Sequence, residues 1–258
     1  MPFKNILLEK REGKGILTLN RPEDLNALSP ELLSELGAAF SDVTEDKDTH
    51  VIILKGKGTS FCAGIDLKLA DGFLGEESEK GLSTFGDKLL PILEQIEECG
   101  KPVICAVQGF AITGGFLLAY YCDFVIASED AVFQDTHAKW GFVPGGWETL
   151  KLPRLIGMHR AKRIFLTCER ITAQEAERMG LIYRVVPKED LRKEAEALAD
   201  RMLKLSSESL RYIKTQINQC TKVDWATALE MDKLIRKNLM AGFITCDTSD
   251  RLKSFGKK

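Results

Sequence analysis

The sequence lacks any uninterrupted apolar stretch long enough to cross a membrane. None of its apolar runs reaches the ~18 residues that a bilayer-spanning helix requires. Charges at Lys4, Glu9 and Lys10 also interrupt the N-terminal segment too early for a secretory signal peptide. We therefore expect no membrane contact and a cytoplasmic location.

Metal-binding patterns of cysteine and histidine are lacking as well. The seven cysteines form no CxxC pair, and His50, His137 and His159 are far apart in the chain. Zinc sites need such residues at short, regular spacings. Scattered cysteines in odd number, some within apolar runs such as PVICAV, are typical of buried, reduced thiols. We expect no metal site.

The chain carries no large excess of charge of either sign. Its 36 basic and 38 acidic residues leave a formal net charge of -2. Such a balance gives no bulk attraction to nucleic acid or to an anionic membrane surface. Neither is expected as a partner, so an anionic ligand has to be held by a local cluster of donors.

What the 258 residues do contain is an alternation of strand-like and helix-like segments. Ser29 followed by Pro30 is a helix-start signal, because serine caps a helix and proline is favoured at its first position. Strands are expected over 15–20, 49–56, 101–111, 123–130 and 131–135, and helices over 29–43, 87–100 and 114–122. This order predicts an α/β core with much parallel pairing.

The later part of the chain is mostly helical in pattern. Helices are expected over 152–167, 172–180, 191–205, 208–219 and 224–243. We therefore divide the chain into a core, residues 1–190, and a C-terminal helical region, residues 191–258.

Two glycine-containing loops resemble sites that present backbone N–H groups to a ligand. One is SFCAGIDLK, residues 60–68, and the other is AITGG, residues 111–115. Two such donors aimed at one oxygen form an oxyanion hole, in which a single donor contributes about 10²–10³ in rate. Glycine turns between strands and helices are also common as purely structural features. Each loop alone leaves both interpretations open.

Taken together, the motifs resemble the crotonase (enoyl-CoA hydratase/isomerase) superfamily over nearly the whole chain. They are LNRPEDLNALS, FCAGIDLK, KPVICAVQGFAITGG, CDFVIASEDAVF, GFVPGG, LPRLIG with RAKRIFLT, and ITAQEAERMGLIYRVVP. The resemblance implies a crotonase-like (ClpP/crotonase) fold of repeated ββα units and a homotrimer or a homohexamer made of two trimers. It assigns residues 191–258 to trimerisation and to covering the active site.

The resemblance also implies an acyl-CoA ligand whose thioester oxygen accepts from the N–H groups of Ile65 and Gly114. Residues at the positions that contact CoA are Asn26, Ala27, Ala63, Leu67, Lys68, Phe255 and Lys258. Lys68 is placed to meet a phosphate, although a solvated surface lysine is an equal alternative. Phe255 and Lys258 lie in a C-terminal tail, which can also be frayed and without a role in binding.

Both glutamates that hold water in the resembled hydratases are replaced. The first position is Leu117 and the second is His137. A leucine can neither position nor deprotonate water, so hydration by a glutamate pair is not expected. An apolar acyl pocket is expected from Phe116, Leu117, Trp140, Gly145 and Trp147.

His137 is the leading candidate for an acid or base, because an imidazole suits proton transfer at neutral pH. Asp135, two residues earlier, lies on the same side if this segment is extended and could orient the ring. A structural histidine is the alternative. Glu148 could point into the acyl pocket, or it could be a solvated residue at a helix start. Tyr120 and Tyr121 are expected to be core or subunit-contact residues.

The resulting prediction is an enzyme of the enoyl-CoA hydratase/isomerase type, a lyase or isomerase of fatty acid metabolism. It would stabilise a thioester enolate in the oxyanion hole, with CoA as part of the substrate and no separate cofactor. Decarboxylation of a malonyl-type acyl-CoA and hydrolysis of a β-diketone are alternatives. A non-catalytic acyl-CoA binding protein is a further alternative. The acyl group itself is not determined by the sequence.

Overall fold

A computed structural model describes residues 3–66 and 78–242 of the chain. Its main sheet has six strands in the order β1-β2-β3-β4-β6-β9. Only the β1–β2 pair is antiparallel, and the other neighbours are parallel. The strands are β1 (Ile6–Arg11), β2 (Lys14–Leu19), β3 (Val51–Gly56), β4 (Val103–Val107), β6 (Phe124–Ser128) and β9 (Arg184–Val186). The predicted α/β class with parallel pairing is confirmed.

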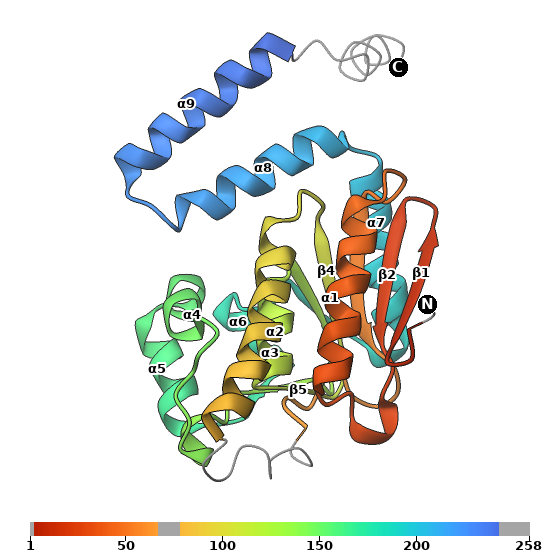
Figure 1. Cartoon of the computed structure of the whole chain (residues 1–258), viewed down its shortest axis with the longest axis vertical. Coiled ribbons are helices and arrows are strands. Elements are labelled where there is room, and N and C mark those ends of the chain that lie inside the picture. Colours follow the sequence, from red (N-terminus) through yellow and green to blue (C-terminus); the bar gives the residue numbers. More distant parts are fainter. Residues whose placement is uncertain (1–2, 67–77, 243–258) are drawn as a thin grey trace.

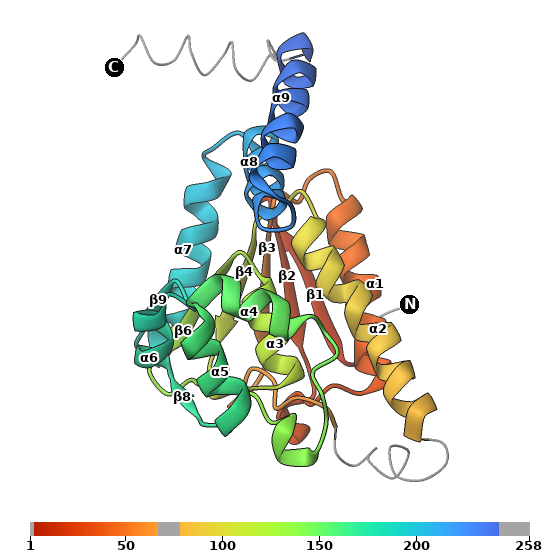
Figure 2. The ribbon, with the colours of Figure 1, turned by 90° about the vertical axis from the view of Figure 1, so that its left-hand side faces the viewer.

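Helices cover both faces of this sheet, as Figure 2 shows. On one face lie α1 (Pro30–Glu45) and α2 (Ser78–Glu98), and on the other lies α7 (Leu191–Leu203). Alternate residues of β3 enter two cores: Ile52 and Leu54 the larger, Val51 and Ile53 the smaller. A strand buried on both faces needs a continuous apolar run, which explains the sequence VIIL.

A second, three-stranded sheet joins the core to the later helices. It consists of β5 (Phe110–Ile112), β7 (Val132–Gln134) and β8 (Ile171–Thr172) in that order. The helix α3 (Gly114–Tyr121) follows β5 and is buried along its whole length. A helix enclosed on all sides is apolar all round, which explains why Phe116 to Tyr120 carry no charge.

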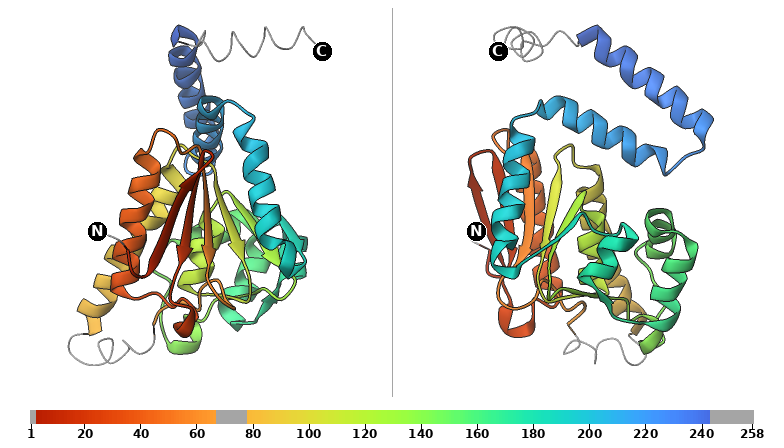
Figure 3. Two further views of the ribbon diagram at one scale, coloured as in Figure 1. Left: turned by 90° about the vertical axis from the view of Figure 1, so that its right-hand side faces the viewer. Right: turned by 180° about the vertical axis from the view of Figure 1, so that it is seen from behind.

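The remaining helices lie at the two ends of the core. They are α4 (Glu148–Ile156), α5 (Met158–Thr167), α6 (Ala173–Met179), α8 (Ser207–Cys220) and α9 (Trp225–Gly242), with short 3₁₀ helices η1 (Pro22–Asp24), η3 (Ala138–Trp140) and η4 (Lys188–Asp190). In Figures 1 and 3, α8 crosses one end of the core and α9 lies beyond it. No helix of the described ranges is long and apolar enough to span a bilayer.

Several element boundaries differ from the sequence-based expectation. The cap at Ser29 is confirmed, because its side chain accepts from the N–H of Leu32 at 3.2 Å. The start of α2 was placed too late: the helix begins at Ser78 rather than residue 87. Phe85 and Leu89, on either side of Gly86 in α2, are buried. Their burial offsets the ~1 kcal/mol that a glycine costs in a helix. The helix expected over 152–167 is broken at Gly157, whose φ is 85°.

Candidate active site

The two glycine loops singled out in the sequence lie against each other. The loop after β3 pairs with β5, since Cys62 N–H donates to Phe110 O at 2.8 Å and Ile112 N–H donates to Cys62 O at 3.0 Å. Gly115 fits closely beneath this contact. A Cβ atom there would lie 2.4 Å from the Cys62 carbonyl oxygen. Glycine at this position therefore permits the approach of the two loops.

The predicted donors Ile65 and Gly114 both have N–H groups without an acceptor among the described residues. On either side of Ile65, Leu28 N–H donates to Gly64 O at 2.7 Å and Asp66 N–H donates to Leu28 O at 3.1 Å. The N–H between them therefore points away from Leu28. Gly114 is the first residue of α3, where a helix has no internal partner for its N–H.

The backbone before each donor takes a conformation that is uncommon for most residues. Gly64 has a φ of 93°, and a Cβ there would lie 2.8 Å from Ile112 O. Thr113 has a φ of 46°, which is rare for a β-branched residue. It is held there by a 2.6 Å hydrogen bond between its Oγ1 and that of Thr136. Such conformations persist only where surrounding contacts hold them.

Arg21 fixes the loop of the first donor, a role that the sequence reasoning missed. Its Nη2 lies 2.8 Å from Asp66 Oδ2 and 2.7 Å from Asp24 Oδ2. Its Nη1 donates to Ala27 O at 2.6 Å. Asp66 therefore ties the donor loop to Arg21 through a largely buried ion pair. The sequence signal was the arginine within LNRPEDLNALS.

The residues predicted to contact CoA are only partly within the described ranges. Asn26 is fully buried, and its side-chain amide donates to Lys57 O at 2.9 Å and Ser60 O at 2.8 Å. It therefore shapes the loop around Ala27 and Ala63. Ala63 N–H donates to Leu25 O at 3.0 Å. Outside the described ranges lie Leu67, Lys68, Phe255 and Lys258.

The structure brings His137, Asp135 and Glu148 together. His137 Nδ1 lies 2.7 Å from Asp135 Oδ2, and His137 Nε2 lies 3.9 Å from Glu148 Oε1. The two carboxylate side chains are 1% and 2% exposed, and the imidazole is 14% exposed. A ring held at Nδ1 and reachable at Nε2 can exchange a proton with a ligand.

The pairing of Asp135 with His137 arises differently from the extended segment that we expected. His137 has helical backbone angles, and its N–H donates to Asp135 Oδ1 at 3.1 Å. This is an Asx turn, in which an aspartate side chain binds the N–H two residues on. One carboxylate therefore holds both the backbone and the ring of the histidine.

Opposing influences act on the pKa of His137. Burial lowers it, but the hydrogen bond and the charge of Asp135, together with the charge of Glu148, raise the pKa above its ordinary value of 6.5. Burial also raises the pKa of Glu148 above 4.5, against the opposite influence of backbone N–H groups and His137. Glu148 therefore takes up a proton at a higher pH than an ordinary glutamate does.

Glu148 is buried, so the solvated alternative for this residue is wrong. It opens α4, and its Oε2 accepts from Gly146 N–H at 2.6 Å. The preceding Trp147 has a φ of 61°, which turns the chain toward the site. Tyr121 fixes the same turn by donating its hydroxyl to Gly146 O at 3.0 Å.

The residues predicted to line an apolar acyl pocket differ in how deeply they are buried. Leu117 is 1% exposed and packs against the 145–148 turn, because a Cβ on Gly146 would lie 2.5 Å from its Cδ2. Phe116 is equally buried and stacks at a tilt on Phe133. Trp140 and Trp147 are half exposed, at 54% and 41%, and their contact with an acyl chain stays a prediction.

The predicted donor Gly114 and the imidazole of His137 are connected through two threonines. Thr113 immediately precedes the donor Gly114, Thr136 immediately precedes His137, and their hydroxyls share a hydrogen bond. The arrangement sets a possible oxyanion hole beside a buried acid–base group, the combination needed for proton transfer next to a carbonyl.

The fold and this site define the crotonase class of acyl-CoA proteins, and comparison with known proteins agrees. The family model for enoyl-CoA hydratase/isomerase matches residues 9–242, so the chain belongs to this family. A crystal structure of an enoyl-CoA hydratase from Bacillus anthracis superposes with a TM-score of 0.91 at 34% identity, covering 98% of this chain and 96% of that one.

Two sequence relatives are similar at comparable levels. A probable peroxisomal enoyl-CoA hydratase 1 of Arabidopsis thaliana is 36% identical, covering 89% of this chain and 85% of the relative. A crotonyl-CoA hydratase of Syntrophomonas wolfei is 37% identical, covering 90% and 89%. Because relatives include peroxisomal and mitochondrial proteins, a cytoplasmic location of this chain stays a prediction.

Proposed function

We propose that the chain hydrates an enoyl-CoA thioester and that His137 moves the proton that a glutamate pair would otherwise handle. The observation that carries this proposal is the Asp135–His137–Glu148 arrangement, with 2.7 Å at Nδ1 and 3.9 Å at Nε2. The resemblance puts His137 at the position of the second glutamate, and the buried carboxylate of Glu148 lies close to its Nε2.

The proposed reaction begins with the thioester oxygen accepting from the N–H groups of Ile65 and Gly114. These donors stabilise the negative charge that develops on this oxygen as an enolate forms. Neutral His137 takes a proton from water at Nε2 while the water oxygen bonds to Cβ. The imidazolium then gives that proton to Cα, and the enolate collapses to a 3-hydroxyacyl thioester. One water is consumed and no redox step occurs.

Asp135 and Glu148 have different roles in this scheme. Asp135 accepts from Nδ1–H, which leaves the lone pair on Nε2, and its charge stabilises the imidazolium. Glu148 Oε1 accepts the second hydrogen of the reacting water. A water about 2.8 Å from each atom can span the 3.9 Å between Glu148 Oε1 and His137 Nε2. The acyl group remains to be found by experiment.

The test is turnover of crotonyl-CoA, followed by loss of the enoyl thioester absorbance. Hydration is expected in the wild-type protein, and His137→Gln should lose about 10²-fold or more in kcat while retaining acyl-CoA binding in calorimetry. His159→Gln is the matched control, because His159 is an exposed residue of α5. Equal rates in the two variants would contradict the role of His137.

A panel of thioesters separates the other chemistries. Malonyl-type and β-keto thioesters and a 3-enoyl thioester report decarboxylation, carbon–carbon hydrolysis and isomerisation. Turnover of one of these without hydration would reassign the reaction within the family. Tight CoA binding without turnover of any of them would identify a non-catalytic binding protein.

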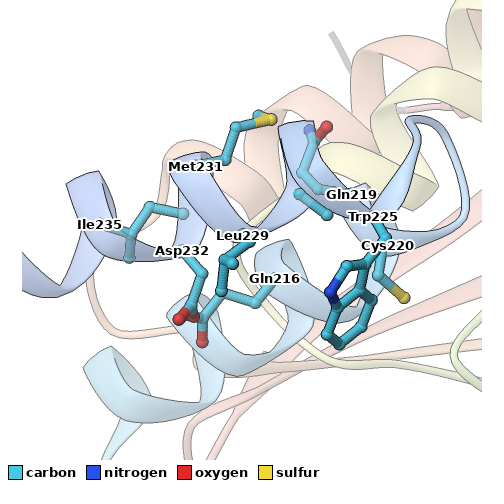
Figure 4. A pocket seen from close by; sticks show the side chains of 9 residues that line it. Gln216, Gln219, Cys220, Trp225, Leu229, Met231, Asp232 and Ile235 are labelled. Atoms are coloured by element: carbon cyan, nitrogen blue, oxygen red, sulfur yellow. The ribbon is translucent and has the colours of Figure 1, made fainter.

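We also propose that the C-terminal helices assemble the chain into a trimer or a hexamer. Helices α8 and α9 enclose a hollow of about 400 Å³, whose lining includes Trp225, Leu229 and Ile235 (Figure 4). Trp225 is 81% exposed and Ile217 is 60% exposed. Large apolar side chains at this level of exposure are typical of subunit contacts. Light scattering tests this, and Ile217→Glu should shift the mass toward a monomer.

A further inference from the structure

Tyr120 carries a buried hydroxyl group for which the described part of the chain offers no hydrogen-bond partner. The residue is 5% exposed. Its ring meets Phe116 edge to face at 5.0 Å and lies 5.6 Å from the ring of Tyr121. Buried hydroxyl groups in proteins are almost always paired with protein or ordered water. The orphan phenol therefore needs an explanation.

The Glu148 carboxylate accepts from backbone N–H groups, but no side chain of the described residues donates a hydrogen bond to it. Oε2 accepts from Gly146 N–H at 2.6 Å. For Oε1, the nearest side-chain nitrogen is His137 Nε2, and its 3.9 Å separation is too long for a hydrogen bond. A carboxylate that is 2% exposed gains little from bulk water. It needs further donors if it is to stay ionised.

Tyr120 shares a face of α3 with Leu117, which packs against the turn that carries Glu148. Tyr120 follows Leu117 by three residues, which puts both on one face of α3. Leu117 Cδ2 and Glu148 Oε1 lie 2.5 and 3.3 Å from the position that a Cβ on Gly146 would take. Burial first, and then the charge of Glu148, raise the pKa of the Tyr120 phenol.

Other titratable groups around the carboxylate are already committed. His137 and Asp135 pair with each other. The Tyr121 hydroxyl donates to Gly146 O. Behind that ring, Lys151 pairs with Glu97 at 2.9 Å, and Glu94 adds only a charge effect on Tyr121. Among the described groups near Glu148, the Tyr120 hydroxyl is the donor that lacks an acceptor.

We propose that Tyr120 is a positioning residue whose hydroxyl donates to the Glu148 carboxylate through one internal water. A single buried water can accept from a phenol and donate to a carboxylate oxygen. This bridge keeps Glu148 ionised and directs Oε1 toward His137. Its effect on turnover rests on the proposed function, whereas its effect on Glu148 in the resting protein does not.

The first test titrates Glu148 by carbon-13 NMR in the resting protein, with Glu148→Gln identifying its signal. Tyr120→Phe removes a donor to the ionised form and should raise the pKa of Glu148 by about one unit. Tyr183→Phe is the matched control, because Tyr183 is an exposed residue that packs on Phe124 and has no contact with the Glu148 turn, and it should leave this pKa unchanged. An unaltered pKa in Tyr120→Phe, or equal shifts in both variants, would overturn the proposal.

The second test separates a donor from a merely buried hydroxyl. Removing an unpaired hydroxyl stabilises a protein, whereas removing a bound donor destabilises it. At pH values above the pKa of Glu148, we expect Tyr120→Phe to lower the midpoint temperature of unfolding. A higher midpoint temperature would refute the bridge. In turnover, Tyr120→Phe should lower kcat about tenfold with little change in KM. That loss should vanish in a Glu148→Gln background.

The experiments distinguish a failure of the proposed function from a failure of the positioning role of Tyr120. If no thioester is turned over, the proposed function fails, while the NMR titration still decides whether Tyr120 serves Glu148. If turnover is normal and the titration of Glu148 is unaffected by Tyr120→Phe, the positioning role fails alone.

Discussion

Replacement of Asp135 by asparagine tests the proposed base most directly, because it removes a charge while keeping size. Asp135 Oδ2 lies 2.7 Å from His137 Nδ1, and its hydrogen bond and charge help to raise the pKa of the imidazole above 6.5. A carboxylate at this distance shifts a pKa by about 1–3 units. Glu148 remains nearby, so we expect the pKa of His137 to fall by about 1–2 units in Asp135→Asn.

The direction of the effect on rate follows from the protonation state that the mechanism needs. His137 must be neutral to accept a proton, so wild-type activity should rise with pH through a pKa above 6.5. In Asp135→Asn the rising limb should move to lower pH. The plateau value of kcat at high pH should nevertheless fall by a factor of about 10² or more. An asparagine amide can donate to Nδ1, which puts the ring hydrogen on Nε2, so that Nε2 can no longer accept a proton.

The assay is kcat for crotonyl-CoA between about pH 5 and about pH 9. Asp130→Asn serves as the control, since Asp130 lies in the turn before β7 and pairs with Lys188 at 2.6 Å. It should reproduce the wild-type profile. If kcat rises at the same pH in Asp135→Asn as in the wild-type protein, the assignment of His137 as the base is refuted. Glu148 would then be tested as the base.

Substitutions at three other positions probe the supporting structure. Gly114→Val should lower kcat by at least about 10², since a Cβ there would lie 2.8 Å from Leu28 Cδ1 beside the Ile65 strand; retained turnover in a folded oligomer would remove the oxyanion assignment. Leu117→Glu should cost about 3 kcal/mol of unfolding free energy, whereas Leu117→Met should cost under ~1.5 kcal/mol, as urea denaturation would measure. Arg21→Met should cost about 2–3 kcal/mol and lower kcat, and an unchanged denaturation midpoint would contradict its structural role.

The sequence alone was sufficient for features that depend on local patterns. The apolar run VIIL predicted a strand over 49–56, and Ser29 with Pro30 predicted the start of α1. The glycines of the two loops predicted exposed backbone donors, and the structure places the two loops together. The edge strand β1 was missed, because five of its six residues are at least partly exposed and its mixed apolar and charged sequence gives little periodic signal.

The pairing of His137 with Asp135 could also be anticipated, because two residues of separation keep side chains within reach in several backbone conformations. The sequence could not say which conformation applies. The Asx turn decided it, since Asp135 binds the N–H of His137 as well as its ring.

Only the tertiary structure brought Glu148 to His137 and buried the Tyr120 hydroxyl group. Glu148 reaches the site because Trp147 reverses the chain and Tyr121 fixes Gly146 from another helix. These contacts join segments that sequence spacing does not relate. Burial, which raises the pKa of Glu148, likewise comes from the packing of α3 against the 145–148 turn. Residue types and order thus determined the family and the donor loops, while packing decided which polar groups share the enclosed site.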